Sequence, residues 1–435
     1  MFGFSSAYSA LLVFLTVLLA INASNAGKFT LFTDQKSKKR SPVILVPGDG
    51  GNQLEVKLDK PSRVHFFCAK KTDNYYNIWL NPFLLLPFVI HCWVDNMRLI
   101  YNNETRRTTN SPGVDVRVPG FGDTSSMEWL DPQKVAIPYI QRMIYGNYYD
   151  DIVNDLVSVG YKRNVDLRGA PYDFRKAPNE MEEYYRNFKN LIEETYYKNN
   201  ETKVTIICHS MGCPVTMYFL NTRPQEWKDK FIKGIVTLNG PFGGAIKAMK
   251  TIVSGENLGI FIVKPSDLII EQRTSVSLSF MLPSPHLWKS DEVIAFTKDR
   301  NYTSNDYEEF FRDMKYSTAY EMYKDTRSHA EISLQPPGVE VYCFYGTGIS
   351  TPDKLDYSNP KDFPYSPKLS FGNGDGTVNA RSLEACSRWQ GKQKQPVSYK
   401  AFEKVEHLLI MHHQPVRKFI LDYVTTWPLD DSEQK

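Results

Sequence analysis

The sequence lacks a surplus of charge of either sign, any internal repeat and any low-complexity segment. Its 435 residues carry 52 Lys and Arg against 49 Asp and Glu, so nucleic acid is not expected as the main partner. Charged residues make up 23% and hydrophobic residues 42%, which excludes wholesale disorder. After residue 26 no run reaches the roughly 18 apolar residues of a membrane span, so we expect a soluble or peripheral mature protein. Metal-ligand spacings are also missing, and we expect neither metal nor cofactor.

The first 26 residues contain no charged side chain and include an apolar run over residues 8–21. Small and polar residues follow up to Ala26. This pattern predicts a secretory signal peptide over 1–26, although the usual basic start is missing. The alternative is an uncut signal anchor, for which an apolar run of about 14 residues is short.

A secretory route permits disulfides and glycans. The chain has six cysteines, for which spacing alone leaves about 15 complete pairings; they are Cys68, Cys92, Cys208, Cys213, Cys343 and Cys386. Three sequons in the mature chain predict surface loops that can carry glycans, at Asn103, Asn200 and Asn301.

Short β-branched runs ending in turn residues are typical of buried strands in a parallel sheet. They occupy 42–46, 204–208 and 234–238, with later strand candidates at 339–345 and 397–402. A helical pattern covers 179–199. The alternation predicts an α/β fold with helices on both faces of the sheet. Two stretches, 64–99 and 242–334, interrupt it and are interpreted as insertions into a core made of 27–63, 100–241 and 335–435.

The sequence His209-Ser210-Met211-Gly212 follows a predicted strand and precedes a helical pattern. A nucleophilic serine sits in this setting when a sharp turn lifts its oxygen out of the sheet edge. Gly212 satisfies the requirement for a small residue after the serine, whereas Cys208 stands where a glycine is usual. The alternative is an ordinary serine in a tight turn.

An acid and a histidine must then follow in that order. Asp375 lies in a glycine-rich turn after a predicted strand, and His407 comes 32 residues later, after another. A simple turn or a cation loop is the alternative for Asp375, but the oxygen-ligand spacing of a calcium loop is missing. His412 and His413 are the rivals of His407 and are predicted to lie on the next helix.

An acyl-transfer site also needs donors for an oxyanion. The glycine-rich segment 47–52 follows the first strand and includes Asp49, while Met211 offers its backbone N–H directly after the serine. A nucleotide-binding loop is the alternative for 47–52, but the segment lacks both of the known phosphate-loop spacings.

Six motifs in this order resemble the lecithin–cholesterol acyltransferase family over nearly the whole mature chain. They are VPGDGGNQLE (46–55), VDVRVPGFG (114–122), DLRGAPYDFR (166–175), HSMG (209–212), GDGTV (374–378) and EH (406–407). The resemblance implies an α/β-hydrolase fold with a membrane-binding insertion at 64–99 and a lid at 242–334. It implies a triad of Ser210, Asp375 and His407, with oxyanion donors at Asp49 and Met211. It also implies disulfides Cys68–Cys92 and Cys343–Cys386.

The activity implied by this resemblance is that of a serine phospholipase A and O-acyltransferase. An acyl chain would move from a glycerophospholipid to water or to a lipid alcohol such as ceramide. The protein is expected to be a monomer of the secretory pathway, located in the lysosome and also secreted. The alternatives are a sterol-directed extracellular acyltransferase and an inactive lipid-binding protein.

Two positions give expectations of their own. Cys208 and Cys213 are expected to be free thiols, because a bridge between them would distort the serine turn. The lysosomal branch of the family similarly has an aspartate at the position of Asp49. The Asp49 carboxylate would repel an oxyanion when ionised, which predicts an acidic pH optimum for the activity. Alternatively, Asp49 only caps a turn.

The first insertion contains an aromatic and aliphatic run too short to span a bilayer. We expect it to form an interfacial surface with two nearby lysines that meet anionic headgroups. The residues of this prediction are Trp79, Leu80, Phe83, Leu84, Leu85, Leu86, Phe88, Lys70 and Lys71. The alternative is that the apolar side chains pack into the core.

Overall fold

Six parallel strands form the central sheet of the computed structural model, which describes residues 40–133, 146–257 and 263–426. Their order across the sheet is β15 (Val397–Glu403), β12 (Glu340–Thr347), β9 (Ile232–Leu238), β8 (Val204–His209), β1 (Val43–Val46) and β7 (Leu167–Gly169). Every strand predicted from an apolar run is present in this sheet, which confirms the α/β prediction. The predicted signal peptide lies outside the described residues.

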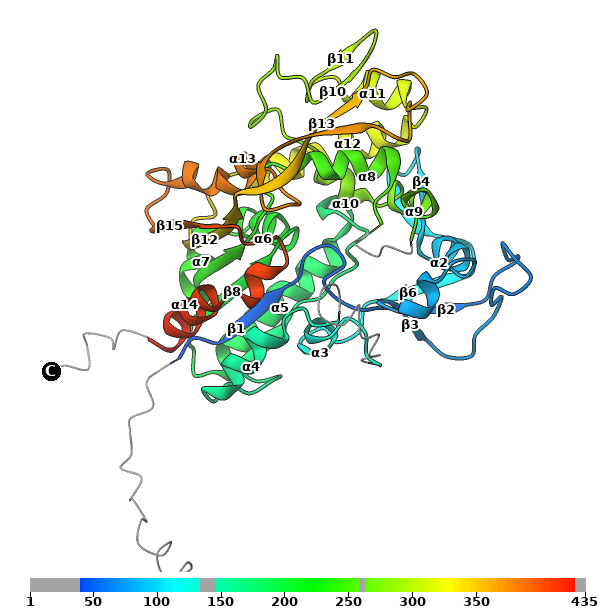
Figure 1. Cartoon of the computed structure of the whole chain (residues 1–435). Helices are drawn as coiled ribbons and strands as arrows, with labels where there is room; N and C mark the ends of the chain where they lie inside the picture. The colour runs from blue at the N-terminus through cyan, green and yellow to red at the C-terminus, as the bar shows by residue number, and fades with distance from the viewer. Residues whose placement is uncertain (1–39, 134–145, 258–262, 427–435) are drawn as a thin grey trace, which may run out of the picture. The chain divides into compact units, whose positions relative to one another are not determined.

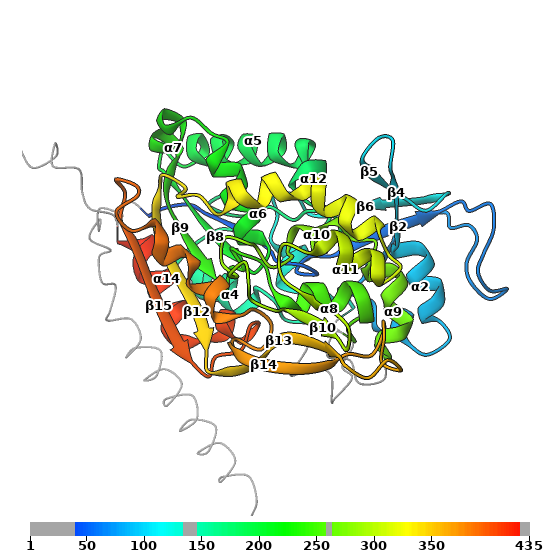
Figure 2. The same cartoon turned by 90° about the horizontal axis from the view of Figure 1, so that it is seen from above.

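The middle strands are buried along their whole length because helices cover both faces. All residues of β1 and β8 are buried, which explains their continuous β-branched sequences. Helices α5 (Glu182–Lys198), α6 (Gly212–Asn221) and α7 (Gln225–Phe231) lie on one face, and α4 (Asp150–Ser158) and α14 (Gln414–Thr425) on the other (Figures 1 and 2). The observed α5 confirms the helix predicted over 179–199, after a short 3₁₀ turn η2 (Pro178–Glu180).

The segment beside the main sheet is partly strand and is longer than the insertion predicted over 64–99, because it begins at β2 (Leu54–Leu58) and continues past β6 (Val114–Arg117). Antiparallel strands β2, β3 (Tyr76–Trp79) and β6 form a three-stranded sheet, and β4 (Leu99–Asn102) pairs with β5 (Arg107–Asn110). The 3₁₀ turn η1 (Pro82–Leu85) and helix α2 (Ile90–Met97) complete it, and the four-residue helix α3 (Ser125–Glu128) follows. The disulfide Cys68–Cys92 ties the loop after β2 to α2, as predicted.

The second insertion contributes a helical cap above the carboxyl ends of the main strands (Figure 1). Its elements are α8 (Ile246–Ser254), α9 (Pro265–Gln272), α10 (Val276–Phe280), β10 (Ala295–Thr297), β11 (Asn301–Tyr302), α11 (Tyr307–Asp313) and α12 (Thr318–Ser333). Strands β13 (Ile349–Tyr357) and β14 (Lys368–Gly374) come later in the chain. They join β10 and β11 in a four-stranded sheet, with β13 parallel to β10.

The remaining short elements lie near the carboxyl end of the chain: α13 (Ala380–Leu383), η3 (Glu384–Trp389) and η4 (Leu409–His412). Cys343 of β12 is bonded to Cys386 of η3, which is the second predicted disulfide. By loop-closure arguments each of the two predicted bridges stabilises the fold by roughly 3–4 kcal/mol.

The surface position predicted for the three sequons is confirmed, and the predicted loop is found at two of them. Asn103, Asn200 and Asn301 are all exposed; the first two lie in turns and the third opens β11. Among the described helices, none combines the length and apolar character needed to cross a bilayer.

Candidate active site

Ser210 occupies the sharp turn between β8 and α6. Its φ of 51° lies in the left-handed region, which a non-glycine residue adopts at a cost and which is common in functional turns. A side chain at Gly212 would approach the backbone oxygen of Pro47 to 2.3 Å, so the position after Met211 must be glycine. The turn therefore has the form predicted for a nucleophile elbow.

The three residues predicted as a triad meet although 165 and 32 residues separate them along the chain. The Ser210 hydroxyl lies 2.8 Å from Nε2 of His407, and Nδ1 of His407 lies 2.6 Å from Oδ2 of Asp375. Asp375 and His407 are buried. This geometry lets the imidazole accept the serine proton while its other nitrogen donates to the carboxylate.

Asp375 is held by its own loop. Its Oδ1 accepts hydrogen bonds from the backbone N–H groups of Thr377 and Val378, at 2.9 and 2.7 Å. The backbone N–H of His407 donates to the Asp375 carbonyl oxygen at 3.0 Å. The strand before Asp375 is β14, so the acid comes from the cap sheet, while His407 follows the last strand of the main sheet.

The two rival histidines point elsewhere. Nδ1 of His412 lies 2.9 Å from Oδ2 of Asp151 on α4. The ring of His413 packs edge-on against Phe402, with centroids 4.9 Å apart. Neither ring takes the place of His407 beside Ser210.

The expectation for Cys208 and Cys213 is wrong. The two residues form a disulfide with their Cα atoms 5.1 Å apart, and the structure has no free cysteine among its described residues. The turn is not distorted by the bridge, because Ser210 keeps its hydrogen bond to His407. Strand and helix approach each other so closely at the elbow that residues two before and three after the serine come within disulfide reach.

The predicted oxyanion loop lies against the nucleophile. A side chain at Gly48 would come within 2.6 Å of the Ser210 Cβ, and Asp49, Met211 and Ser210 line one pocket. The indole Nε1–H of Trp79 donates to the Gly50 carbonyl oxygen at 2.8 Å and braces the loop. The backbone of residues 48–51 is thus fixed beside the serine, as an oxyanion site requires.

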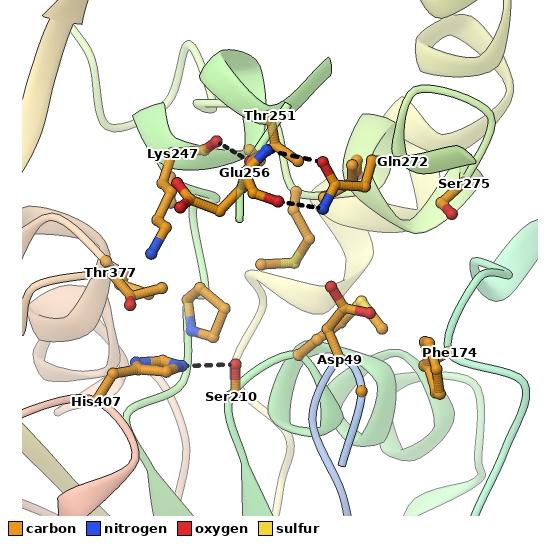
Figure 3. Close-up of a pocket in the computed structure, with 18 of the residues that line it drawn as sticks. Asp49, Phe174, Ser210, Lys247, Thr251, Glu256, Gln272, Ser275, Thr377 and His407 are labelled. Carbon is orange, nitrogen blue, oxygen red and sulfur yellow. Dashed lines mark hydrogen bonds between the residues drawn. The ribbon is translucent and has the colours of Figure 1, made fainter. Parts of the chain in front are cut away.

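The triad opens into a cavity of about 340 Å³ between the main sheet and the cap. Apolar side chains supply most of its wall, among them Trp93, Met97, Phe174, Leu278 and Met281. Figure 3 shows the polar groups facing Ser210 from the cap, including Lys247, Glu256 and Gln272. Such a wall suits a chain-like apolar ligand with a polar end.

Two carboxyl groups of this cavity have raised pKa values. Asp49 is accessible to water within the pocket, yet removal from bulk solvent raises its pKa to about 7, offset in part by a hydrogen bond from the Gly50 backbone. Burial raises the pKa of Glu271 on α9 to about 8, where the nearby Arg175 acts in the opposite direction. Both groups are therefore largely protonated at pH 5 and largely or partly ionised at pH 7.5.

The predicted membrane residues divide into two groups. Trp79, Leu80 and Leu85 are 4, 5 and 2% exposed, so for these three the predicted surface position is wrong and the core alternative holds. Trp79 ends β3 and Leu85 ends the 3₁₀ turn η1, so their inward positions depend on a local geometry that a continuous apolar run does not reveal. Leu84 is partly buried, whereas five others of the predicted set are exposed: Phe83, Leu86, Phe88, Lys70 and Lys71.

Sequence reasoning missed the neighbouring loop. Phe66 and Phe67 are 84 and 50% exposed, with their rings 5.4 Å apart in an edge arrangement. They lie just before Cys68, inside the predicted insertion, and an apolar pair beside a disulfide was the signal that could have found them. No cluster of three or more potential metal ligands occurs among residues 40–133, 146–257 and 263–426.

The chain is similar in sequence to several known proteins. The lysosomal phospholipase A and acyltransferase of Bos taurus is 46% identical over 372 residues, covering 86% of this chain and 88% of that protein. The Homo sapiens protein of that name is 44% identical and covers 91% of each chain. The phosphatidylcholine-sterol acyltransferase of Homo sapiens is 42% identical over 86% of this chain and 82% of its own.

Among solved structures, one chain of the Tle4–Tli4 complex aligns with a TM-score of 0.48 and 13% identity, over 89% of this chain and 99% of that one. The family model described as lecithin:cholesterol acyltransferase matches residues 75–335 and 321–414. The protein has an α/β-hydrolase fold, and the chain belongs to the lecithin:cholesterol acyltransferase family.

Proposed function

We propose that this protein is a serine phospholipase A and O-acyltransferase that moves an acyl chain from a glycerophospholipid to water or to a lipid alcohol. The observation that carries the proposal is the hydrogen-bonded series Ser210–His407–Asp375 opening into a mainly apolar cavity. Membership of a family whose members are named as phospholipid acyltransferases supports the substrate class.

The mechanism follows from the geometry. His407 Nε2 takes the proton of Ser210 as its oxygen attacks an acyl carbonyl of the phospholipid, and Asp375 stabilises the resulting imidazolium. The backbone N–H groups of Asp49 and Met211 receive the oxyanion. His407 then returns the proton to the leaving oxygen, so a lysophospholipid departs and the acyl chain stays on Ser210.

The second half repeats these steps with a new nucleophile. Water or a lipid alcohol enters, gives its proton to His407 and attacks the acyl-enzyme, and the proton returns to Ser210 as the ester breaks. The product is a fatty acid or an acylated alcohol. Every acid–base role belongs to side chains of this protein, so we propose that the reaction is independent of calcium and needs no cofactor.

We propose acidic working conditions, and with them a lysosomal location in the secretory pathway. The support is the raised pKa of Asp49, whose carboxyl is mostly neutral below about 7 and so does not repel the developing oxyanion. The sequence likeness to proteins named as lysosomal points the same way. The sterol-directed relatives are nearly as similar, so a sterol acceptor is the second candidate.

We further propose that the first insertion contacts the lipid surface as part of a monomer. The proposed contact surface consists of five exposed apolar side chains on the loop before Cys68 and the segment before α2: Phe66, Phe67, Phe83, Leu86 and Phe88. The disulfide between Cys68 and Cys92 holds the two segments together. Exposed Lys70 and Lys71 lie beside it and would attract anionic headgroups.

The test uses the mature protein with phosphatidylcholine liposomes that contain either a short-chain ceramide or a sterol. Release of fatty acid and formation of acylated acceptor are followed at pH 4.5 and 7.4, with and without EDTA. We expect acyl-ceramide and fatty acid mainly at pH 4.5, unchanged by EDTA and abolished by Ser210→Ala.

Each other outcome has a distinct meaning. Activity mainly at pH 7.4 with sterol as the better acceptor would replace the proposal with the sterol-directed function. Activity that persists in Ser210→Ala would overturn the assignment of the nucleophile. Folded protein without activity at either pH would contradict the enzymatic proposal altogether.

A further inference from the structure

A buried row of hydrogen bonds runs behind Ser210, between the oxyanion loop and the loop that carries His407. The backbone N–H of Gly48 donates to the hydroxyl oxygen of Tyr148 at 2.9 Å. The same hydroxyl lies 2.5 Å from Nδ1 of His209, and Nε2 of His209 lies 3.0 Å from the carbonyl oxygen of His407. Tyr148 and His209 are both buried, and neither belongs to the triad.

The direction of every donor in this row can be assigned. A carbonyl oxygen only accepts, so Nε2 of His209 carries a proton and donates to His407. Burial lowers the pKa of His209 well below its ordinary value, which leaves the imidazole neutral and Nδ1 an acceptor. Tyr148 therefore donates its hydroxyl proton to His209 while its oxygen accepts from Gly48. All donors point the same way, an arrangement in which hydrogen bonds strengthen one another.

The two ends of the row lie in the oxyanion loop and in the loop of His407, which are far apart along the chain. Gly48 precedes the oxyanion donor Asp49, and a side chain at Gly51 would strike the Tyr148 ring at 2.6 Å, so this loop wraps around the tyrosine. At the other end, the His407 carbonyl accepts a second bond from the side-chain amide of Asn239, at 2.9 Å. The Asn239 amide oxygen in turn accepts from the Gly346 N–H on β12.

We propose that Tyr148 and His209 are positioning residues that form a bridge between the oxyanion loop and the loop of the catalytic base. The inference rests on the proposed function and adds to it. The oxyanion donors and His407 lie on either side of Ser210, and the bridge fixes the distance between them. Because it works through backbone atoms of Gly48 and His407, its loss shifts both groups relative to the serine without removing either.

The experiment uses the full mature chain and a short-chain soluble ester, so that membrane binding does not enter. Tyr148→Phe removes only the hydroxyl at the centre of the bridge. The matched control is Tyr161→Phe, because Tyr161 is equally buried and its hydroxyl also makes two hydrogen bonds, to Ser41 and Val424. Those bonds lie at the opposite end of β1 from the active site.

We expect Tyr148→Phe to lower kcat at least about tenfold with little change in KM, since small misplacements of catalytic groups cost rate rather than binding. The rate at which a fluorophosphonate labels Ser210 should fall in parallel, because its tetrahedral adduct needs the same oxyanion donors. Both variants should lose similar thermal stability, and Tyr161→Phe should keep wild-type kcat. Equal kcat values in the two variants would overturn the proposal.

A double-mutant cycle with His209→Gln provides a second, independent test. If the bridge acts as a unit, the double variant loses no more activity than the worse single variant, because either change already breaks the row. Losses that multiply would show that the two side chains act separately and would also overturn the proposal. Wild-type protein that does not hydrolyse the ester would instead contradict the proposed function, which separates the two failures.

Discussion

At the scale of single residues, Asp49 joins two roles that oppose each other. Its backbone belongs to the proposed oxyanion site, while its carboxyl faces the same cavity as Ser210. An ionised carboxylate there disfavours the negative charge of the transition state, and a protonated one does not. We therefore expect the residue to link the activity to pH through a group outside the proposed triad.

We expect Asp49→Asn to change the pH profile more than the maximal rate. As pH rises through about 7, wild-type Asp49 ionises and the activity on a soluble ester should fall. The amide cannot ionise, so the variant should keep at least about half of its pH 5 activity at pH 7.5, where most of the wild-type Asp49 is ionised. A wild-type profile that is flat from pH 4.5 to 7.5 would contradict this explanation.

Sequence reasoning selected Ser210, Asp375 and His407, which the structure brings together, because each lies in a turn with its own local signature. It missed Tyr148 because a tyrosine has no such signature, and its partner His209 lies 61 residues away. The disulfide of Cys208 with Cys213 was missed for a related reason: the separation of two side chains across the elbow depends on the turn geometry.

At the scale of elements, the first insertion shows what an apolar run does and does not determine. The main strands could be predicted because β-branched runs bounded by turns are buried on both faces. In the first insertion, aromatic residues of one apolar run are partly buried and partly exposed. Trp79 turns inward to brace Gly50, while Phe88 is 79% exposed nine residues later. Strand β7 was missed because it has only three residues and includes Arg168, whose Nε donates to the Gly122 carbonyl.

We expect the double variant Phe66→Ser and Phe88→Ser to bind phosphatidylcholine liposomes at least about tenfold more weakly, because each phenyl ring buried in lipid contributes roughly 1.5–3 kcal/mol. Cosedimentation or surface plasmon resonance on immobilised vesicles measures the change. Phe371→Ser is the control, since Phe371 is also an exposed phenylalanine, at 58%, but lies on β14.

Hydrolysis of a soluble ester separates a surface role from a folding role in the same variants. It should be unaffected by either set of changes. If ester hydrolysis and liposome binding were lost together, these phenylalanines would be needed for folding rather than for contact with lipid.

At the scale of the whole molecule, the cavity couples folding stability to pH. Asp49 and Glu271 have folded-state pKa values of about 7 and 8, above their ordinary values of 3.8 and 4.5. Their contribution to stability is fully present below the ordinary values and is lost as pH rises through the folded ones. His209 acts in the opposite direction, because its lowered pKa costs stability as pH falls below 6.5. The wild-type curve is the sum of these effects.

The effect of one carboxyl is isolated by Glu271→Gln. Because the amide carries no charge at any pH, the variant should gain about 2 °C or more in Tm at pH 7.5 relative to wild type. At pH 5, where the wild-type carboxyl is already neutral, the gain should be smaller. Differential scanning fluorimetry at the two pH values measures the difference, and an equal gain at both would show that folding does not raise the pKa of Glu271.

The strand pairing of the cap has a consequence for how this enzyme can be rebuilt. Asp375, the acid of the proposed triad, follows β14, whose neighbour β13 runs parallel to β10 of the cap. One of the three proposed catalytic residues is therefore carried by the cap sheet. A cap exchanged with a relative as a cassette over residues 242–334 would replace β10 and place a foreign strand against the original β13. A chimaera that is meant to take over the substrate preference of a relative must therefore exchange both segments, 242–334 and 349–374.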